Sequence, residues 1–277
     1  MRLKNRSRVV ITGAASGLGR VMALKLAERG ARIALTDRDE DGLGPVSEAV
    51  AGAGGEPLVH ALDVRDNDAW AALADKITES WGGVDLLINN AGVGDMGTLV
   101  ESKYVHWDRQ LDINVMGVVR GSKTFVPGMI KARRGHVINV ASFAGVAQAP
   151  GMIAYNTAKA AVIAFSESLR AEVEPEGVGV SVLCPAFFKT NLTDSMMDTS
   201  QEMVHRINGW MERSGVTAED VADAALNAVE KGRFMVLTHA QTRRYWWLKR
   251  FAPERYIKLM MAQATKRKNN AKRKDNH

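Results

Sequence analysis

The stretch "RVVITGAASGLGR", residues 8–20, decides the fold. Its first part is a short aliphatic run, which predicts a buried parallel strand. Gly13, Gly17 and Gly19 follow, and they lead directly into the helix-period segment "GRVMALKLAERG" at residues 19–30. Glycines in such a strand–turn–helix unit let the backbone approach a pyrophosphate at the helix N-terminus, so the stretch predicts a nucleotide-binding loop. A purely structural turn between strand and helix is the alternative.

The same strand-and-helix alternation continues through the first 190 residues. Further apolar runs are "ARIALTD" (31–37), "PLVHALDV" (57–64), "VDLLINNAG" (84–92), "GHVINVAS" (135–142) and "GVSVLCPA" (179–186). Helix-period segments separate them, so we expect an α/β, Rossmann-like doubly wound parallel sheet with helices on both faces. Because no repeat or linker-like segment interrupts the pattern, we expect one catalytic domain at residues 1–239 and a C-terminal extension at residues 240–277.

Composition limits the class of protein. The chain has 277 residues and is 46% apolar, enough for one sizeable core. A single cysteine, Cys184, excludes an intramolecular disulfide and fits a reducing compartment. The first apolar run is too short for a signal peptide, and no stretch reaches the 18 apolar residues of a membrane span. These features predict a cytoplasmic protein.

Positive charge is concentrated at the C-terminus. Residues 240–277 carry 12 Lys and Arg against 2 Asp and Glu, whereas residues 1–239 have a net charge of −4. The body therefore gives no indication of nucleic-acid binding. We also expect no metal site.

An acidic residue ends the second predicted strand. Asp37 lies 24 positions after Gly13, where a carboxylate can accept hydrogen bonds from both hydroxyls of an adenine ribose. A 2′-phosphate would meet a like charge there, which favours NAD(H) over NADP(H). Arg38 leaves NADP(H) open, because an arginine can bind a 2′-phosphate. A turn residue at a strand end is the structural alternative for Asp37.

Four further motifs follow the glycine-rich loop. They are "NNAG" at 89–92, Asn114 in "LDINVMG", Ser142 in "NVASFAG" and "YNTAK" at 155–159. In this order and spacing, with a loop of the form TGxxxGxG, the chain resembles the short-chain dehydrogenase/reductase family from residue 7 to about residue 235. The resemblance implies an NAD(P)-dependent oxidoreductase that interconverts an alcohol (a CH–OH group) and a carbonyl. A non-catalytic dinucleotide-binding sensor or scaffold is the alternative.

The resemblance implies a catalytic set of Asn114, Ser142, Tyr155 and Lys159. Tyr155 and Lys159 are one helical turn apart, so a lysine ammonium would favour the phenolate and suit the tyrosine to general acid/base catalysis. Ser142 would hydrogen-bond the substrate oxygen, and Asn114 would hold a water that links Lys159 to solvent. Taken alone, Ser142 also fits a strand-end cap, and Asn114 fits a helix-interior polar residue.

The resemblance also implies a set of cofactor contacts. They are Gly13, Ser16, Gly17, Leu18, Gly19, Asp37, Arg38, Asp63, Val64, Asn90, Ala91, Gly92, Tyr155, Lys159, Pro185, Phe188 and Thr190. Within this set, Asp63 and Val64 would contact the adenine, and Thr190 would hold the nicotinamide carboxamide. The sequence departs from the family where Ala186 replaces the usual glycine after proline. A positive φ at Ala186 would strain the backbone.

The family resemblance implies that residues 191–215 form a mobile substrate lid. The apolar residues of this segment are Leu192, Met196, Met197, Met203, Val204, Ile207, Trp210 and Met211. Methionines adapt to irregular apolar shapes, so the lid predicts a lipophilic substrate such as a long-chain aldehyde, a retinoid or a steroid-like ring. Packing of the lid onto the body is the alternative. We expect His106 and His205 to be packing or surface residues.

The C-terminal extension is basic and rich in tryptophan. Residues 241–265 predict two short helices with a break before Pro253, and residues 266–277 predict disorder. Trp247 and Phe251 share one helix face among interleaved Arg and Lys, a pattern that favours peripheral binding to an anionic membrane surface. Alternatives are a subunit contact, a cap on the substrate pocket and a contact with RNA. The family resemblance implies a homodimer or homotetramer formed through helices near Val115 and Tyr155.

Overall fold

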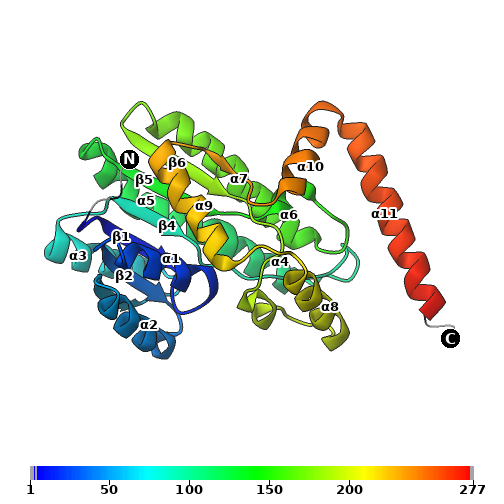
Figure 1. Ribbon diagram of the computed structural model, residues 1–277, viewed down its shortest axis with the longest axis horizontal. Coiled ribbons are helices and arrows are strands. Elements are labelled where there is room, and N and C mark those ends of the chain that lie inside the picture. The colour runs from blue at the N-terminus through cyan, green and yellow to red at the C-terminus, as the bar shows by residue number, and fades with distance from the viewer. Residues whose placement is uncertain (1–2, 4, 275–277) are drawn as a thin grey trace.

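The computed structural model describes residues 3 and 5–274. Within them, seven strands form one parallel sheet in the order β3-β2-β1-β4-β5-β6-β7 (Figure 1). The strands are β1 (Arg8–Thr12), β2 (Arg32–Asp37), β3 (Glu56–Ala61), β4 (Leu86–Asn89), β5 (Gly135–Val140), β6 (Val178–Leu183) and β7 (Met235–Val236). The predicted doubly wound α/β fold is confirmed, and six strands lie in the six predicted runs.

The seventh strand was not predicted. β7 has only two residues and pairs with β6 through Val182↔Met235 and Leu183↔Val236. A two-residue strand is too short for a period to show in the sequence. Its place at the edge follows from pairing with β6.

Two layers of helices cover the sheet. On one face lie α1 (Gly17–Ala27), α2 (Glu40–Gly52) and α9 (Ala218–Lys231), and on the other lie α3 (Asn67–Trp81), α5 (Gly117–Lys131) and α7 (Ile153–Val173). Val9 and Ile11 of β1 join the first core and Val10 joins the second, because successive strand side chains point to opposite faces. Burial on both faces explains why β1 is a continuous apolar run.

The strand order determines where a ligand can bind. The chain runs outward from β1 to β3 and then returns to place β4 beside β1. In open α/β sheets, the loops that leave the carboxyl ends of strands at such a reversal enclose a crevice that binds ligands. The glycine-rich loop follows β1 and the "NNAG" segment contains the end of β4, so both border this crevice.

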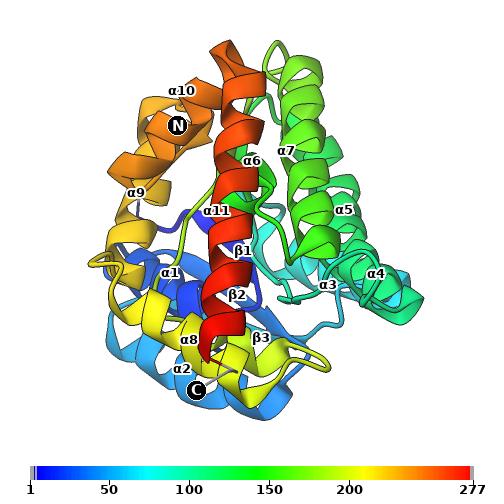
Figure 2. The same cartoon turned by 90° about the vertical axis from the view of Figure 1, so that its right-hand side faces the viewer.

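The remaining helices surround the carboxyl edge of the sheet. They are α4 (Tyr104–Leu111), the π-helix η1 (Asp112–Met116), α6 (Phe143–Ala147), the 3-10 helix η2 (Asn191–Ser195), α8 (Gln201–Glu212), α10 (Ala240–Phe251) and α11 (Pro253–Lys274). The last two form the C-terminal hairpin. Figure 2 shows α11 running down the side of the molecule that faces the viewer.

The C-terminal hairpin differs in part from its prediction. The break before Pro253 is present, but α11 is a long helix that continues to Lys274, where the sequence predicted disorder from residue 266. Residues 275–277 of that predicted tail lie outside the described residues. Among the described residues, no helix combines the length and the apolar content that a bilayer span requires.

Candidate active site

The glycine-rich loop adopts a conformation that only glycine accommodates easily. Gly13 and Gly17 have φ of +67° and +51°. A Cβ on Gly13 would lie 2.9 Å from Ala91 Cα, and a Cβ on Gly19 would fall on the carbonyl oxygen of Gly13. Helix α1 therefore packs directly against the loop, and Gly13 and Gly19 leave no room there for a side chain.

The loop after β4 supports the loop after β1. Asn90 Nδ2 donates to the carbonyl oxygens of Thr12 (2.9 Å) and Gly13 (3.0 Å), and Thr12 Oγ1 accepts the backbone N–H groups of Asn90 and Ala91. Thr12 was absent from the predicted set. A hydroxyl at the end of a strand was the available signal, and it gains meaning only once β4 is known to lie beside β1.

Helix α1 begins at the crevice. Ser16 is its N-cap in an extended conformation, and its side chain makes no capping hydrogen bond. The first N–H groups of a helix lack partners within the helix and carry the positive end of the helix dipole. Together with the glycine backbone, the first turn around Gly17 and Leu18 forms a cradle suited to a pyrophosphate.

Charged side chains mark the end of the crevice near β2 and β3. Asp37 accepts N–H groups from Ala15 (3.1 Å) and Asp39 (3.1 Å), while Arg38 is exposed. Asp63 binds Arg65 through both carboxylate oxygens, and the hydrogen bond from Arg65 lowers the pKa of Asp63. Arg65 borders the same cavity and was not predicted.

Ser142 lies between β5 and α6. It is the N-cap of α6, and its Oγ accepts the N–H of Ala144 at 3.1 Å. The alternative interpretation of Ser142 as a strand-end cap is therefore confirmed. Ser142 also hydrogen-bonds Tyr155, so this hydroxyl faces α7 as well.

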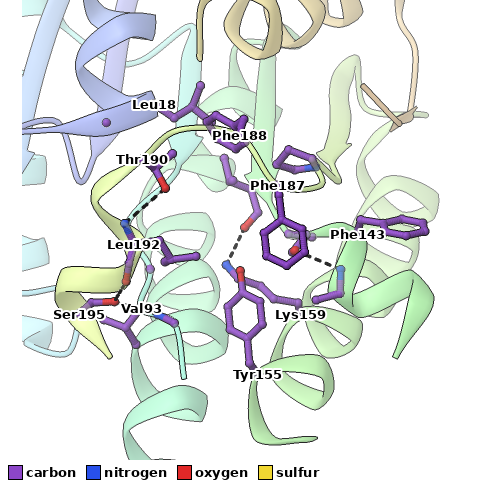
Figure 3. Close-up of a pocket in the computed structure, with 18 of the residues that line it drawn as sticks. Leu18, Val93, Phe143, Tyr155, Lys159, Phe187, Phe188, Thr190, Leu192 and Ser195 are labelled. Atoms are coloured by element: carbon purple, nitrogen blue, oxygen red, sulfur yellow. Dashed lines mark hydrogen bonds between the residues drawn. The ribbon is translucent and has the colours of Figure 1, made fainter. Parts of the chain in front are cut away.

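Lys159 lies on α7 one turn after Tyr155 and is 4% exposed. Its Nζ donates to the Val140 carbonyl at 2.9 Å and lies 5.8 Å from the centroid of the Tyr155 ring (Figure 3). Burial lowers the pKa of Lys159 to about 8. Its ammonium is therefore easier to deprotonate than that of a surface lysine.

The expected effect of Lys159 on Tyr155 is not what the structure shows. Tyr155 is buried, and burial raises its phenol pKa, although the hydrogen bond with Ser142 opposes that shift. Desolvation disfavours the phenolate. In this state of the protein Tyr155 is a protonated acid at neutral pH, whereas the sequence predicted a lowered pKa.

Asn114 lies inside the π-helix η1, and its side chain is fully buried. Its Oδ1 accepts the N–H of Val93 and its Nδ2 donates to the Val93 carbonyl, each at 3.0 Å. Short π-helical turns between α-helical segments are frequent at functional sites. A Cβ on Gly92 would lie 2.7 Å from Asn114 Oδ1 and 3.2 Å from Lys159 Nζ, so these three residues are packed together.

The segment after β6 crosses over Tyr155 and Lys159. Figure 3 shows Phe187 facing both side chains and Thr190 further along the same segment. Thr190 Oγ1 accepts the N–H of Leu192 at 3.3 Å. The non-glycine residues of the described chain with positive φ are Arg6, Arg133, Gln148 and Asp198. Ala186 is not among them, so its substitution for glycine brings no backbone strain.

One cavity of about 910 Å³ connects these groups. Of the predicted site residues, those that line it are Gly13, Ser16, Gly17, Leu18, Asp37, Arg38, Asp63, Val64, Asn90, Ala91, Gly92, Ser142, Tyr155, Lys159, Pro185, Phe188 and Thr190. Gly19 and Asn114 lie behind the cavity wall, where they pack against Gly13 and Gly92. The cradle, the acidic strand end and the buried Tyr155–Lys159 pair fit a dinucleotide with its nicotinamide beside the tyrosine.

The segment predicted as a lid lies over the cavity. Five of its eight apolar residues line the cavity: Leu192, Met196, Ile207, Trp210 and Met211. Met197, Met203 and Val204 lie outside that lining, so packing accounts for part of the apolar pattern. Asp198 pairs with Lys103 at 2.6 Å, and Arg109 donates to the Ser195 carbonyl at 2.8 Å, which attaches the segment to the body.

His106 and His205, the two histidines considered in the sequence analysis, lie outside the cavity lining. His106 is 4% exposed, with Nδ1 at 2.7 Å from Asp95 and Nε2 at 3.3 Å from Asp198. His205 is exposed on α8. Both positions agree with the expected packing and surface roles.

The C-terminal hairpin forms another wall of the cavity. Tyr245, Tyr256 and Met260 line it. Tyr256 donates its hydroxyl to the Ala147 carbonyl at 2.6 Å, and Lys249 Nζ donates to the Val146 carbonyl at 2.7 Å. These bonds satisfy carbonyls at the end of α6, the helix that begins after Ser142. Sequence reasoning gave a cap on the pocket only as an alternative and named none of these residues as site residues.

Fold and site together define a dinucleotide-binding α/β protein. A family model described as "short chain dehydrogenase" matches residues 7–201. The chain therefore belongs to the short-chain dehydrogenase/reductase family of oxidoreductases. A crystal structure titled as a short chain dehydrogenase/reductase from Burkholderia phymatum in complex with NAD is 34% identical, with a TM-score of 0.86 over 92% of this chain and 96% of that chain.

Two curated relatives extend this comparison. "Dehydrogenase/reductase SDR family member 7B" of Xenopus tropicalis is 34% identical over 266 residues, which are 93% of this chain and 85% of the relative. "Probable oxidoreductase EphD" of Mycobacterium tuberculosis is 34% identical over 232 residues, 80% of this chain. That alignment spans only 39% of EphD, so the likeness to EphD concerns part of that protein.

Proposed function

We propose that the protein is an NAD-dependent oxidoreductase that interconverts a lipophilic alcohol and its carbonyl. The observation that carries this proposal is the grouping of Ser142, Tyr155 and Lys159 on the wall of the cavity that also contains the glycine-rich loop. A buried acid/base group beside a dinucleotide cradle suits hydride transfer coupled to proton transfer.

Tyr155 is the proposed general acid/base. In reduction it donates its phenolic proton to the carbonyl oxygen, and its raised pKa keeps that proton available at neutral pH. In oxidation the phenolate form of Tyr155 takes the proton of the substrate hydroxyl. Ser142 donates a hydrogen bond to the same oxygen and stabilises negative charge that develops there.

Lys159 and Asn114 support this step. Lys159 would bind the hydroxyls of the nicotinamide ribose through its ammonium, which lies 5.8 Å from the ring centroid of Tyr155. Asn114, packed against Gly92 beside Lys159, would hold the water that connects Lys159 to solvent. The nicotinamide group, when bound, supplies the hydride acceptor or donor.

The remaining predicted contacts would bind the rest of the cofactor. The loop from Gly13 to Gly19 would hold the pyrophosphate, Asp37 the adenine ribose and Asp63 with Val64 the adenine. Thr190 and Pro185 would border the nicotinamide. Asp37 supports NAD(H) over NADP(H), since a carboxylate repels a 2′-phosphate.

The substrate side of the cavity supports a lipophilic substrate. Its apolar residues come from the lid and from the C-terminal hairpin, and they include Met196, Trp210, Met211, Tyr245 and Met260. Flexible methionines beside aromatic rings suit a bulky apolar group, such as a long alkyl chain or a fused ring system.

We further propose a homodimer or homotetramer formed through α4, α5 and α7, near Val115 and Tyr155. Large apolar side chains are exposed at the start of this region, among them Tyr104 (89%), Val105 (51%) and Met116 (42%). An exposed apolar patch on a folded chain supports a subunit contact. Light scattering of the purified protein would give the mass directly.

A substrate screen tests the proposed activity. The purified protein is incubated with alcohols, aldehydes and ketones of increasing alkyl or ring size, and the absorbance of reduced nicotinamide is followed with NAD(H) and with NADP(H). We expect turnover that rises with apolar size and is faster with NAD(H). Tight NADH binding without turnover of any substrate would favour a cofactor-binding sensor or scaffold.

A further inference from the structure

Helix α10 has two chemically different faces. One face carries Thr242, Tyr245 and Lys249, which contact the cavity or α6. The opposite face is exposed and carries Trp247 and Phe251 at 54% and 71% exposure. The proposed enzymatic function uses only the first face.

The exposed aromatic residues form an ordered pair. The rings of Trp247 and Phe251 stack at a centroid distance of 5.1 Å and an interplanar angle of 13°. Arg243, Arg244 and Arg250 are exposed on the same helix, three or four positions from Trp247. An indole and a phenyl ring between guanidinium groups can enter the headgroup region of a bilayer while the charges remain among lipid phosphates.

Helix α11 also carries exposed apolar and basic side chains. Ile257 and Met261 are 50% and 62% exposed and lie one turn apart, next to exposed Lys258. Between residues 240 and 265 the sequence holds six Lys or Arg and a single acidic residue, Glu254. We define the hairpin's outer face as Arg243, Arg244, Trp247, Arg250, Phe251, Ile257, Lys258 and Met261.

We infer that the outer face docks on a bilayer containing anionic phospholipids. Each basic residue near such a surface contributes about 1 kcal/mol of attraction, and the region from residue 240 to the end carries a net charge of +10. The rest of the chain has a net charge of −4 and is weakly repelled by the same surface. This asymmetry orients the protein with the hairpin toward the lipid.

Docking in this orientation brings the substrate cavity to the membrane. Tyr245 and Tyr256, on the inner side of the hairpin, line the cavity, while Trp247 and Phe251 on the outer side would contact lipid. The cavity wall is thus one helix thick between substrate and bilayer. Resting on the proposed function, this arrangement assigns a membrane-dissolved alcohol or carbonyl as the substrate class.

Sedimentation with lipid vesicles tests the docking. The full chain is mixed, without substrate, with phosphatidylcholine vesicles that contain or lack phosphatidylserine, at low and at physiological salt. We expect binding only to the anionic vesicles and weaker binding at higher salt. Equal binding to neutral and anionic vesicles, or none to either, would overturn the inference.

Two double variants separate the aromatic and the charged contributions. The first variant combines Trp247→Ala with Phe251→Ala, and the second combines Arg243→Glu with Arg244→Glu. Each should weaken vesicle binding by roughly tenfold or more. The matched control is Leu99→Ala with Val100→Ala, which removes apolar side chains of 66% and 95% exposure outside the hairpin. A control variant that loses as much binding as the other two would contradict the assignment of this face.

The same samples distinguish docking from its alternatives. Light scattering should give the same mass for the parent and the Trp247/Phe251 variant, and a lower mass for the variant would mean that the face binds a second copy. NADH binding should be unchanged in both double variants. Vesicle binding is measured without substrate, so a protein without enzymatic activity would still give this result. Turnover without vesicle binding would overturn the docking and leave the proposed enzymatic function standing.

Discussion

The glycine-rich loop after β1 and the C-terminal hairpin border the same cavity, yet they depend on sequence in different ways. The loop is held by contacts that allow one residue type, since Gly13 has a φ of +67° and lies against Ala91. The hairpin meets the cavity through the side chains of Tyr245, Tyr256 and Met260, and none of these three residues has a positive φ that would restrict the residue type. We therefore expect substitutions in the loop to abolish cofactor binding and substitutions in the hairpin to alter substrate use.

In the comparison of these two regions, the largest effect on cofactor binding is expected from Gly13→Ala. A Cβ there would lie 2.9 Å from both Ala91 Cα and Asn90 Nδ2, at a φ that alanine rarely adopts. The backbone strain and the close contacts would together cost about 2 kcal/mol. NADH binding should therefore weaken by at least roughly tenfold, which fluorescence titration measures. Gly44→Ala is the matched control, because open space surrounds Gly44 in α2. Equal loss in both variants would contradict the role of the loop.

The second prediction concerns how the desolvation of Lys159 on α7 affects the free energy of unfolding. The pKa of Lys159 is about 8 in the folded chain against 10.5 as its ordinary value, so folding disfavours its ammonium. This cost is fully present below pH 8 and is relieved as pH rises toward 10.5. The free energy of unfolding of the parent should therefore rise relative to Lys159→Met by roughly 2 kcal/mol between pH 7 and pH 10. Urea unfolding of both proteins gives this difference, and a constant difference would show that Lys159 is not desolvated.

Asp37→Ala should change cofactor preference rather than turnover. Without the carboxylate, the repulsion of a 2′-phosphate disappears and Arg38 remains exposed beside the site. The ratio of kcat/KM for NADH over NADPH should fall by roughly tenfold, which corresponds to about 1.4 kcal/mol. Asp41→Ala, at an exposed position in α2, should leave that ratio unchanged. A parent enzyme that already prefers NADPH would reject the assignment of Asp37.

The smallest effect is expected in the hairpin. Tyr256→Phe removes the hydroxyl that donates to the Ala147 carbonyl at 2.6 Å, with a loss of about 1 kcal/mol in the free energy of unfolding. KM for the substrate should rise a few-fold because the wall of the cavity loosens, while the NADH dissociation constant stays the same. Tyr104 is 89% exposed, so Tyr104→Phe should change neither the free energy of unfolding nor KM. Weaker NADH binding in Tyr256→Phe would remove the distinction between the two regions.

The sequence predicts the nucleotide half well because its constraints are local. A buried strand, a positive-φ glycine and an acidic strand end are each visible within a few residues, and the structure brings Gly13, Asp37 and Asn90 to one cavity as expected. Thr12 was missed because its contacts lie on the neighbouring strand end, at Asn90 and Ala91. Arg65 was missed because its role follows from its ion pair with Asp63 within the same loop.

The substrate half was less predictable because its contacts join distant segments. Tyr256 reaches Ala147 across 109 positions, and no local pattern indicates such a bond. The pKa of Tyr155 was predicted to fall because its neighbour Lys159 is visible in the sequence, whereas the burial that raises it is not. A positive φ at Ala186 would have strained the backbone, and the loop avoids such a φ.

The most direct test of the proposed mechanism is a comparison of Tyr155→Phe with the parent protein. The variant keeps the ring in the cavity wall and removes only the hydroxyl that transfers the proton. Titration with NADH and turnover of a substrate identified by the screen are measured on the same preparation. We predict an NADH dissociation constant within about twofold of the parent and a loss of kcat by a factor of at least roughly 100. Turnover equal to that of the parent would show that Tyr155 is not the acid/base group and would contradict the mechanism.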